Sequence, residues 1–203
     1  KGKCMSNAQE KRQIILETAS KLFSRYGFNK TSLDEIAATA QIAKGTVYYY
    51  YANKEELFMA AVEKKAEDYF LALQEQLDEI ESFEAKLHAF LHIPIRFVYE
   101  NMPILIECMR NLPYNYQDRL NGFRLGNRSR MMEMLKGILK LGEEQGILAD
   151  NISGERLSDM LVDWYLMGDM SFTVIDVPKL LQRIERDHEL IIQMILYGIV
   201  KRG

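Results

Sequence analysis

Apolar residues recur along this 203-residue chain every three or four positions, which is the period of an α-helix with one buried face. In the N-terminal part this pattern predicts helices over residues 8–26, 33–40 and 44–51, and a long helix from Asn53 to about residue 80. Gly27 ends the first helix. Ser32 and Asn53 can each accept a hydrogen bond from the backbone N–H three residues further on, which starts a helix at both places.

The same period continues beyond residue 80. It predicts a helix that begins at Phe83 and is kinked or interrupted at Pro94, and further helices over residues 103–111, 115–145, 153–174 and 178–201. The sequence contains no strand-like alternation, no internal repeat and no low-complexity linker. The predicted fold is therefore all-α, with about nine helices, in which an N-terminal three-helix domain is joined by a long helix to a C-terminal helical domain.

The helices predicted over residues 33–40 and 44–51, with a four-residue turn between them, have the dimensions of a helix-turn-helix motif. Other compact helical hairpins share this spacing, so the side chains of the second helix are more informative. At about 100° per residue, Val47 and Tyr51 share one face and Tyr50 lies at its edge. The opposite face presents Gly45, Thr46, Tyr48 and Tyr49.

This second face suits DNA. Hydroxyl groups of Thr46, Tyr48 and Tyr49 can donate hydrogen bonds to phosphate oxygens or base edges, and Gly45 lets the backbone approach the groove wall closely. Lys54 lies in the first turn of the next helix, where the helix dipole disfavours a cation unless an anion such as a phosphate binds there. The alternative for Lys54 is a solvated ammonium group on a side chain whose stem packs on Tyr51.

Charge is divided unevenly along the chain. Residues 1–54 hold nine Lys or Arg against four Asp or Glu, a net charge of +5, whereas the remainder holds 17 basic and 25 acidic residues, a net charge of −8. A basic N-terminal part favours a polyanionic partner for that part alone. A solvated basic surface is the alternative.

Several classes of protein are not indicated. No apolar run approaches the roughly 18–20 residues of a membrane span, and the N-terminus lacks the apolar centre of a signal peptide, so we expect a cytoplasmic protein without a membrane partner. Cys4 and Cys108 lack metal-type spacing, and His88 and His92 have no third ligand at a clear spacing, so no metal or other cofactor is expected. Catalytic triad order, a glycine-rich phosphate loop and a convincing acid pair are also missing, which argues against an enzyme.

Residues 22–58, LFSRYGFNKTSLDEIAATAQIAKGTVYYYYANKEELF, resemble the DNA-binding domain of TetR-family transcriptional regulators. The resemblance rests on Phe23, on the pairs Tyr26–Gly27, Thr31–Ser32 and Ile36–Ala37, and on the runs 44–48 and 54–57. It implies that operator DNA is contacted by Ser32, Lys44, Gly45, Thr46, Tyr48, Tyr49 and Lys54.

Two residues depart from the family's pattern. Gln41 stands where a turn glycine is usual, so it must accept the turn conformation at a strain cost of about 1 kcal/mol. Ala43 stands where a serine usually opens the recognition helix, and it therefore lacks an N-cap bond worth roughly 0.5–2 kcal/mol. The usual contact from that serine to a phosphate is lost with it.

Beyond residue 54 the resemblance extends only to length and helix order. It implies a DNA-binding domain over residues 8–54 and an effector-binding and dimerisation domain over residues 55–203, whose last two helices form half of a four-helix bundle in a homodimer. The interface candidates are Leu161, Gly168, Leu181, Ile184, His188, Ile191 and Ile195. The broad apolar face of the last helix agrees with this, because an unpaired face of that kind would be an exposed patch. Packing of both helices on their own chain is the alternative.

The family's central helices usually enclose an effector pocket. Candidates to line it are Phe90, Phe97, Met102, Met109, Tyr114, Phe123, Asn127, Met131 and Trp164. Methionine adapts to irregular ligands, and an asparagine on an apolar stripe needs a hydrogen-bond partner, although ordinary core packing is the alternative for each aromatic residue and methionine. An anionic effector could be recognised by Arg119, Arg124, Arg128 and Arg130, or these side chains could be solvated.

The expected function is therefore that of a homodimeric repressor, released from double-stranded palindromic operator DNA by an unknown small-molecule effector. The alternative is a helical protein-interaction module that docks through its tyrosine-rich helix. The first hypothesis predicts that Tyr48→Phe and Lys54→Ala weaken operator binding with little change in melting temperature. It also predicts that binding weakens with salt, because phosphate contacts release counterions.

Overall fold

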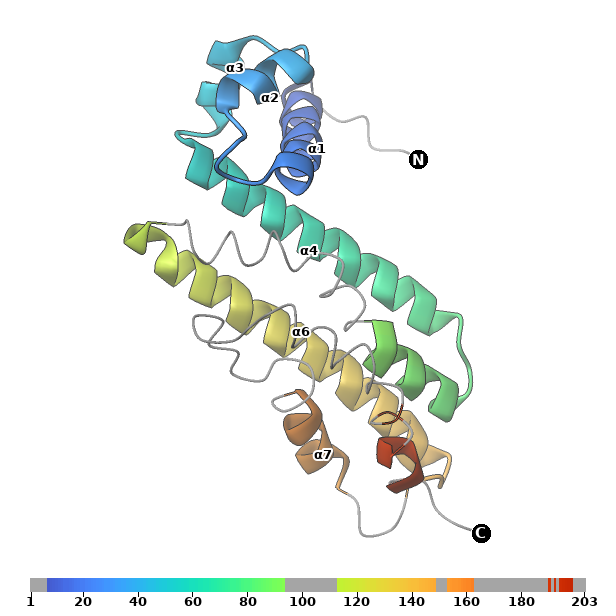
Figure 1. Cartoon of the computed structure of the whole chain (residues 1–203). Coiled ribbons are helices and arrows are strands. Elements are labelled where there is room, and N and C mark those ends of the chain that lie inside the picture. The colour runs from blue at the N-terminus through green and yellow to red at the C-terminus, as the bar shows by residue number, and fades with distance from the viewer. Residues whose placement is uncertain are drawn as a thin grey trace. The chain divides into compact units, whose positions relative to one another are not determined.

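The computed structural model describes residues 7–93, 113–148, 153–162, 190, 192 and 194–198, and the regular elements in these ranges are all helices (Figure 1). The fold is all-α, as predicted. The N-terminal elements are α1 (Asn7–Tyr26), α2 (Leu33–Thr39), α3 (Lys44–Tyr50) and the long α4 (Lys54–Asp78). Residues 83–93 form the next helix.

The later elements begin with a short 3-10 helix, η1 (Tyr114–Tyr116), which leads directly into α6 (Gln117–Glu144). They continue with α7 (Gly154–Leu161), and residues 190, 192 and 194–198 are also helical. Helix ends agree with the predicted ones within two residues wherever both are described. The helix predicted over residues 103–111 lies outside the described residues, as do the second half of 153–174 and most of 178–201.

The described residues fall into two compact units, whose boundaries lie inside α4 and α6. One unit, the head, comprises residues 7–70 and 113–120. The other, the body, comprises residues 71–93, 121–148 and 153–162 and the described C-terminal residues. The functional division between residues 54 and 55 stays a prediction.

The core of the head is built around three phenylalanines. The rings of Phe23 and Phe58 meet edge to face at 4.9 Å between centroids, and Phe28 lies 4.9 Å from Phe58. Helix α2 packs against both α1 and α3 (Figure 1). Ile36 of α2 and Val47 of α3 are fully buried, so these contacts hold the recognition helix by one face only.

Local geometry in the head follows the sequence signals. The backbone N–H of Glu35 donates to Ser32 Oγ at 3.1 Å, which caps α2. Gln41 has a φ of 56° and is the only non-glycine residue with positive φ among those described, so it carries the strain expected of a residue in a glycine position. Ala43 makes no side-chain cap bond at the start of α3. The turn conformation predicted for Gln41 and the missing N-cap bond predicted at Ala43 are both confirmed.

The core of the body lies between α6 and the helix over residues 83–93. Phe83, Leu87, Phe90 and Leu91 are fully buried, and α6 contributes Met131, Leu135, Ile138 and Leu139. A Cβ added at Gly142 would lie 2.6 Å from Cε2 of Phe83, so the absence of a side chain on α6 lets that ring pack against its backbone.

Candidate nucleic-acid interface

Helix α3 has one buried and one exposed face, as its period predicts. Val47 and Tyr51 are buried, with Tyr51 only 2% exposed, whereas Tyr49 is 82% exposed and Tyr48 is 46% exposed. Tyr50 lies between the two faces and its hydroxyl donates to the carbonyl of Ala8 at 3.0 Å. Two of the four consecutive tyrosines therefore attach the recognition helix to its own domain, and the other two face outward.

Gly45 belongs to the exposed face, in the first turn of α3. A Cβ built at this position would meet no atom of the described protein within 4 Å. Nothing inside the described part of the chain therefore requires a glycine here. Its bare backbone is available to an external surface, and a glycine in a helix otherwise costs about 0.5–1 kcal/mol relative to alanine.

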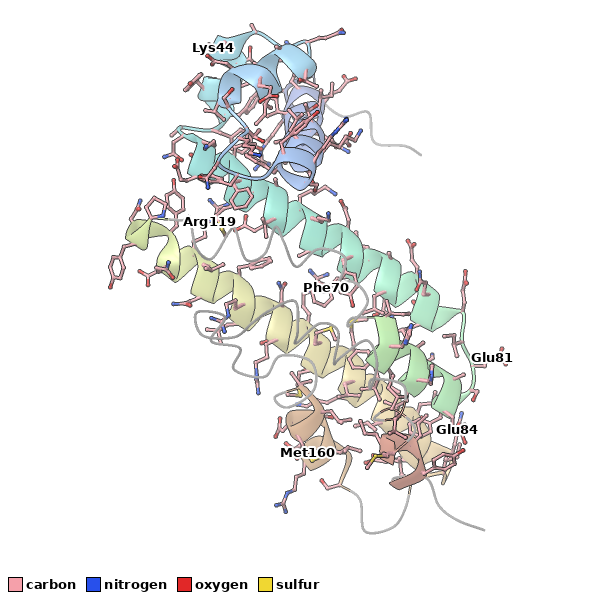
Figure 2. The ribbon with its side chains drawn as sticks, viewed as in Figure 1. Lys44, Phe70, Glu81, Glu84, Arg119 and Met160 are labelled. Atoms are coloured by element: carbon pink, nitrogen blue, oxygen red, sulfur yellow. The ribbon has the colours of Figure 1, made fainter. Side chains whose placement is uncertain are left out.

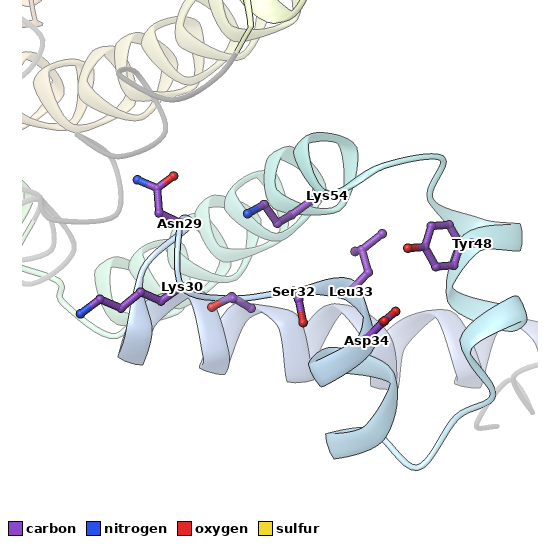
Figure 3. A pocket seen from close by; sticks show the side chains of 8 residues that line it. Asn29, Lys30, Ser32, Leu33, Asp34, Tyr48 and Lys54 are labelled. Carbon is purple, nitrogen blue, oxygen red and sulfur yellow. The ribbon is translucent and has the colours of Figure 1, made fainter.

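A hollow of about 390 Å³ lies beside this face (Figure 3). It brings together three of the predicted DNA-binding residues, namely Ser32 from the cap of α2, Tyr48 from α3 and Lys54 from α4. The other lining residues are Asn29, Lys30, Thr31, Leu33 and Asp34. Lys30 was not among the predicted contacts. The only sequence feature that pointed to Lys30 was its contribution to the positive charge of residues 1–54.

Lys54 is held by the head rather than freely solvated. Its Nζ donates to the carbonyl of Phe28 at 3.0 Å and lies 4.2 Å from the centroid of the Phe28 ring. The alternative drawn from the sequence was that the Lys54 stem packs on Tyr51, whereas these two contacts are with Phe28. An ammonium group has three hydrogens, so this bond leaves donors that can face the hollow.

Lys44 and Asp34 form an exposed ion pair of 2.7 Å at the edge of the same surface. The hydrogen bond to Asp34 raises the pKa of the Lys44 ammonium. Lys44 Nζ also lies 5.7 Å from the centroid of the Tyr48 ring. Because exposed pairs are weak, a phosphate could replace Asp34 as the partner of Lys44 at small cost.

The predicted effector residues are only partly described. Phe90 and Met131 are buried in the body, and Phe123 and Asn127 are half-buried on α6. Tyr114 is 90% exposed in η1, which contradicts a position inside an enclosed pocket. Phe97, Met102, Met109 and Trp164 lie outside the described residues. The pocket itself stays a prediction.

The predicted dimer interface is likewise only partly described. Leu161 is buried within its own chain, which agrees with the alternative of packing on its own subunit, and Ile195 is half-buried. Gly168, Leu181, Ile184, His188 and Ile191 lie outside the described residues. The large apolar side chains that are exposed in these elements are instead Met160 of α7 (Figure 2), Leu190, Met194 and Tyr197. The last three are spaced i, i+4 and i+7, a helical signal in the sequence that the prediction missed.

The described residues also bear on metal binding and on membrane insertion. His88 and His92 stack with centroids 6.0 Å apart, and the described residues hold no cluster of three or more His, Cys, Asp or Glu side chains suited to a metal ion. Among those same residues, no helix combines the length and apolar character needed to cross a bilayer.

Comparison with known proteins agrees with the resemblance described above for residues 22–58. The family model for bacterial regulatory proteins, tetR family, matches residues 15–61, a range that contains all seven candidate DNA contacts. The fatty acid metabolism regulator protein of Bacillus subtilis (strain 168) is 26% identical over 172 residues, which cover 85% of this chain and 83% of that protein. The HTH-type transcriptional regulator TtgR of Pseudomonas putida is 25% identical over 185 residues, which cover 85% and 88%.

Solved structures share the fold of this chain. The structure of a SmeT–triclosan complex matches with a TM-score of 0.67 at 21% identity, over 96% of this chain and 94% of that chain. A likeness at this level of identity shows the fold alone. It matches the expected arrangement of an N-terminal helix-turn-helix domain and a C-terminal helical domain.

Proposed function

We propose that this chain, which belongs to the tetR family of bacterial regulatory proteins, is a homodimeric repressor that a small-molecule effector releases from its operator. The observation that carries the proposal is the division of α3 into a buried face and an exposed face. Val47 and Tyr51 fix the helix, and Tyr48 and Tyr49 remain outside with Gly45. A recognition helix needs this combination, because it must be rigid on one side and accessible to a groove on the other.

The exposed face of α3 and the hollow beside it would make different contacts with DNA. The hydroxyls of Tyr48 and Tyr49 would donate to phosphates or base edges. Lys30 and Lys54, with Ser32 between them, supply cations and a hydroxyl around the hollow, where a backbone phosphate can lie. Lys44 would exchange its pair with Asp34 for a phosphate. Each phosphate contact of this kind adds to the salt dependence of binding.

A dimer is part of the proposal because two recognition helices must reach successive major grooves, about 34 Å apart. The exposed apolar residues Met160, Leu190, Met194 and Tyr197 supply surface that a second subunit would cover. They replace Leu161 as the basis for the interface, since Leu161 is already buried in its own chain.

We further propose an apolar effector that binds in the body. The related solved structure holds triclosan, a small chlorinated aromatic molecule, and the Bacillus subtilis relative is named for fatty acid metabolism. An effector releases DNA only if it binds the released conformation more tightly than the DNA-bound one. A role of this kind needs no catalysis, and the relatives named above are regulators. We expect the protein in the cytoplasm, because a repressor must lie where its bacterial operator DNA lies.

The test is fluorescence anisotropy with labelled duplexes from the region upstream of the chain's own gene. Wild-type protein should bind with an affinity that falls as salt rises, and Tyr49→Phe should bind more weakly. Tyr114→Phe is the matched control, because it removes a hydroxyl from an equally exposed tyrosine away from α3. No binding at low salt, or equal losses for both variants, would contradict the proposal. Binding to protein but not to DNA would favour an interaction module instead.

A further inference from the structure

The first turn of α6 and the preceding η1 make two polar contacts with α4, both inside the head. The hydroxyl of Tyr116 donates to Asn53 Oδ1 at 2.8 Å. The guanidinium of Arg119 binds the carboxylate of Glu63 through two parallel hydrogen bonds, Nε to Oε1 at 2.8 Å and Nη2 to Oε2 at 2.6 Å. We name these two contacts the clasp. Arg119 lies on the side of α6 that faces α4 (Figure 2).

Asn53 is the last residue of the short connection between the recognition helix and α4. Its Oδ1 already accepts a hydrogen bond of 2.8 Å from the backbone N–H of Glu56, which caps α4. The bond from Tyr116 occupies the second lone pair of the same oxygen. Tyr51, two residues before Asn53, is the C-cap of α3. Tyr116 therefore fixes the cap whose orientation sets the short connection between α3 and α4.

The second contact prevents rotation about the first. Glu63 lies ten residues beyond Asn53, about 15 Å further along α4 at 1.5 Å per residue. A bidentate arginine–carboxylate pair also defines the relative orientation of the two side chains, which a single hydrogen bond does not. Two contacts separated along one helix thus fix both the position and the direction of α4 relative to the start of α6.

The charge of Arg119 also acts on the side chain of Tyr51, the C-cap residue of α3. Burial raises the pKa of the Tyr51 hydroxyl, and the charges that act on that hydroxyl are Arg12 of α1, Glu56 of α4 and Arg119 of α6. Glu56 in turn accepts a hydrogen bond of 2.9 Å from the backbone N–H of Ala52. Charged groups from three helices therefore act on the hydroxyl of Tyr51, the C-cap residue of α3.

We propose that Tyr116 and Arg119 are positioning residues for operator binding, which hold the recognition helix in place through the connection between α3 and α4. The inference rests on the proposed function of the chain as a DNA-binding regulator. The Arg119–Glu63 pair is partly exposed, with 38% of the Arg119 side chain and 34% of the Glu63 side chain accessible, and the Tyr116–Asn53 bond is exposed as well. Both contacts therefore add little to overall stability and can open without unfolding. Helix α6 also carries Phe123, Asn127 and Met131, so the predicted effector residues lie on the helix that makes the clasp.

The variants Tyr116→Phe and Arg119→Gln test the proposal by anisotropy with the upstream duplex and by hydrogen–deuterium exchange. Each should weaken operator binding about 3- to 10-fold, the net loss expected for one or two partly exposed hydrogen bonds, with an unchanged melting temperature. Exchange of the amides of residues 44–56 should become faster in both variants. Tyr114→Phe and Arg156→Gln are matched controls, because they remove the same groups from exposed positions of η1 and α7.

Two further measurements separate positioning from direct DNA contact. Removing a phosphate contact lowers the slope of log affinity against log salt, whereas weaker positioning leaves the slope unchanged. The charge reversal Glu63→Arg with Arg119→Glu should restore the affinity that Arg119→Gln loses. A reduced slope, a failure of the reversal to restore affinity, or variants within twofold of a wild type that binds would overturn the clasp. If the wild type binds no operator, the proposed function fails, and unchanged amide exchange would still refute the clasp on its own.

Discussion

Replacing Gly45 by alanine should stabilise the protein and weaken its binding to operator DNA at the same time. Gly45 lies in the first turn of α3, and a Cβ built there meets nothing within 4 Å, so the free protein can accept the methyl group without strain. Alanine is favoured over glycine in a helix by roughly 0.5–1 kcal/mol. In a chain of this size that gain raises the melting temperature by about 2–4 °C per kcal/mol.

The effect on DNA binding has the opposite sign. If the backbone at Gly45 lies against the groove wall, a methyl group must displace that contact, and neighbouring hydroxyls such as those of Thr46 and Tyr48 move away with it. A loss of one such contact region corresponds to at least tenfold weaker binding, or about 1.4 kcal/mol. A residue that matters only for folding would not show a gain in stability together with a loss in affinity.

Calorimetry and anisotropy at fixed salt measure the two effects on the same preparations. Gly137→Ala is the matched control, because Gly137 is also an exposed helical glycine whose added Cβ meets nothing within 4 Å, but it lies in the body on α6. It should show the same gain in melting temperature and unchanged operator affinity. Unchanged affinity in Gly45→Ala would refute a close approach of DNA to this backbone. A lower melting temperature would refute the open environment that the structure gives Gly45.

Three other substitutions test the structure itself. Gly142→Ala should destabilise the body by about 1–3 kcal/mol in urea unfolding, because its Cβ would lie 2.6 Å from the Phe83 ring; a neutral effect would mean that the ring moves freely. Gln41→Gly should relieve the positive φ and raise the free energy of unfolding by up to about 1 kcal/mol, with operator affinity unchanged; destabilisation would contradict the strain. Lys54→Ala should lower the melting temperature as well as operator affinity, since it removes contacts with Phe28 worth roughly 1–2 kcal/mol, and an unchanged melting temperature would restore the expectation drawn from the sequence.

The helical period was enough to predict the faces of the recognition helix. Side chains three and four positions apart must share a face on any α-helix, so Val47 and Tyr51 could be placed together and Tyr49 opposite them before any packing was known. Capping is equally local, since it joins residues three positions apart, and the caps at Ser32 and Asn53 follow from the residue types alone.

Period and composition were not enough where a residue type fits several environments. The aromatic ring of Tyr114 makes it a candidate to line a pocket, yet this residue follows Pro113 in a short 3-10 turn and is exposed. The last helix is apolar on a broad face, so the sequence could not distinguish Ile195 from Leu190 and Met194 as the outward-facing residues. Which apolar side chains are covered depends on the neighbouring helices, and no local pattern contains that information.

The sequence by itself therefore determined what each short segment becomes: its helices, their caps and the outward tyrosines. Only the tertiary structure decided which distant residues meet. Lys54 bonds to Phe28, 26 residues away, and Tyr116 bonds to Asn53, 63 residues away. Contacts of this kind depend on the angles and distances at which whole helices pack, which are set by the fit of many side chains at once. The period of one helix fixes its own faces, but it does not specify the residue that another helix brings to them.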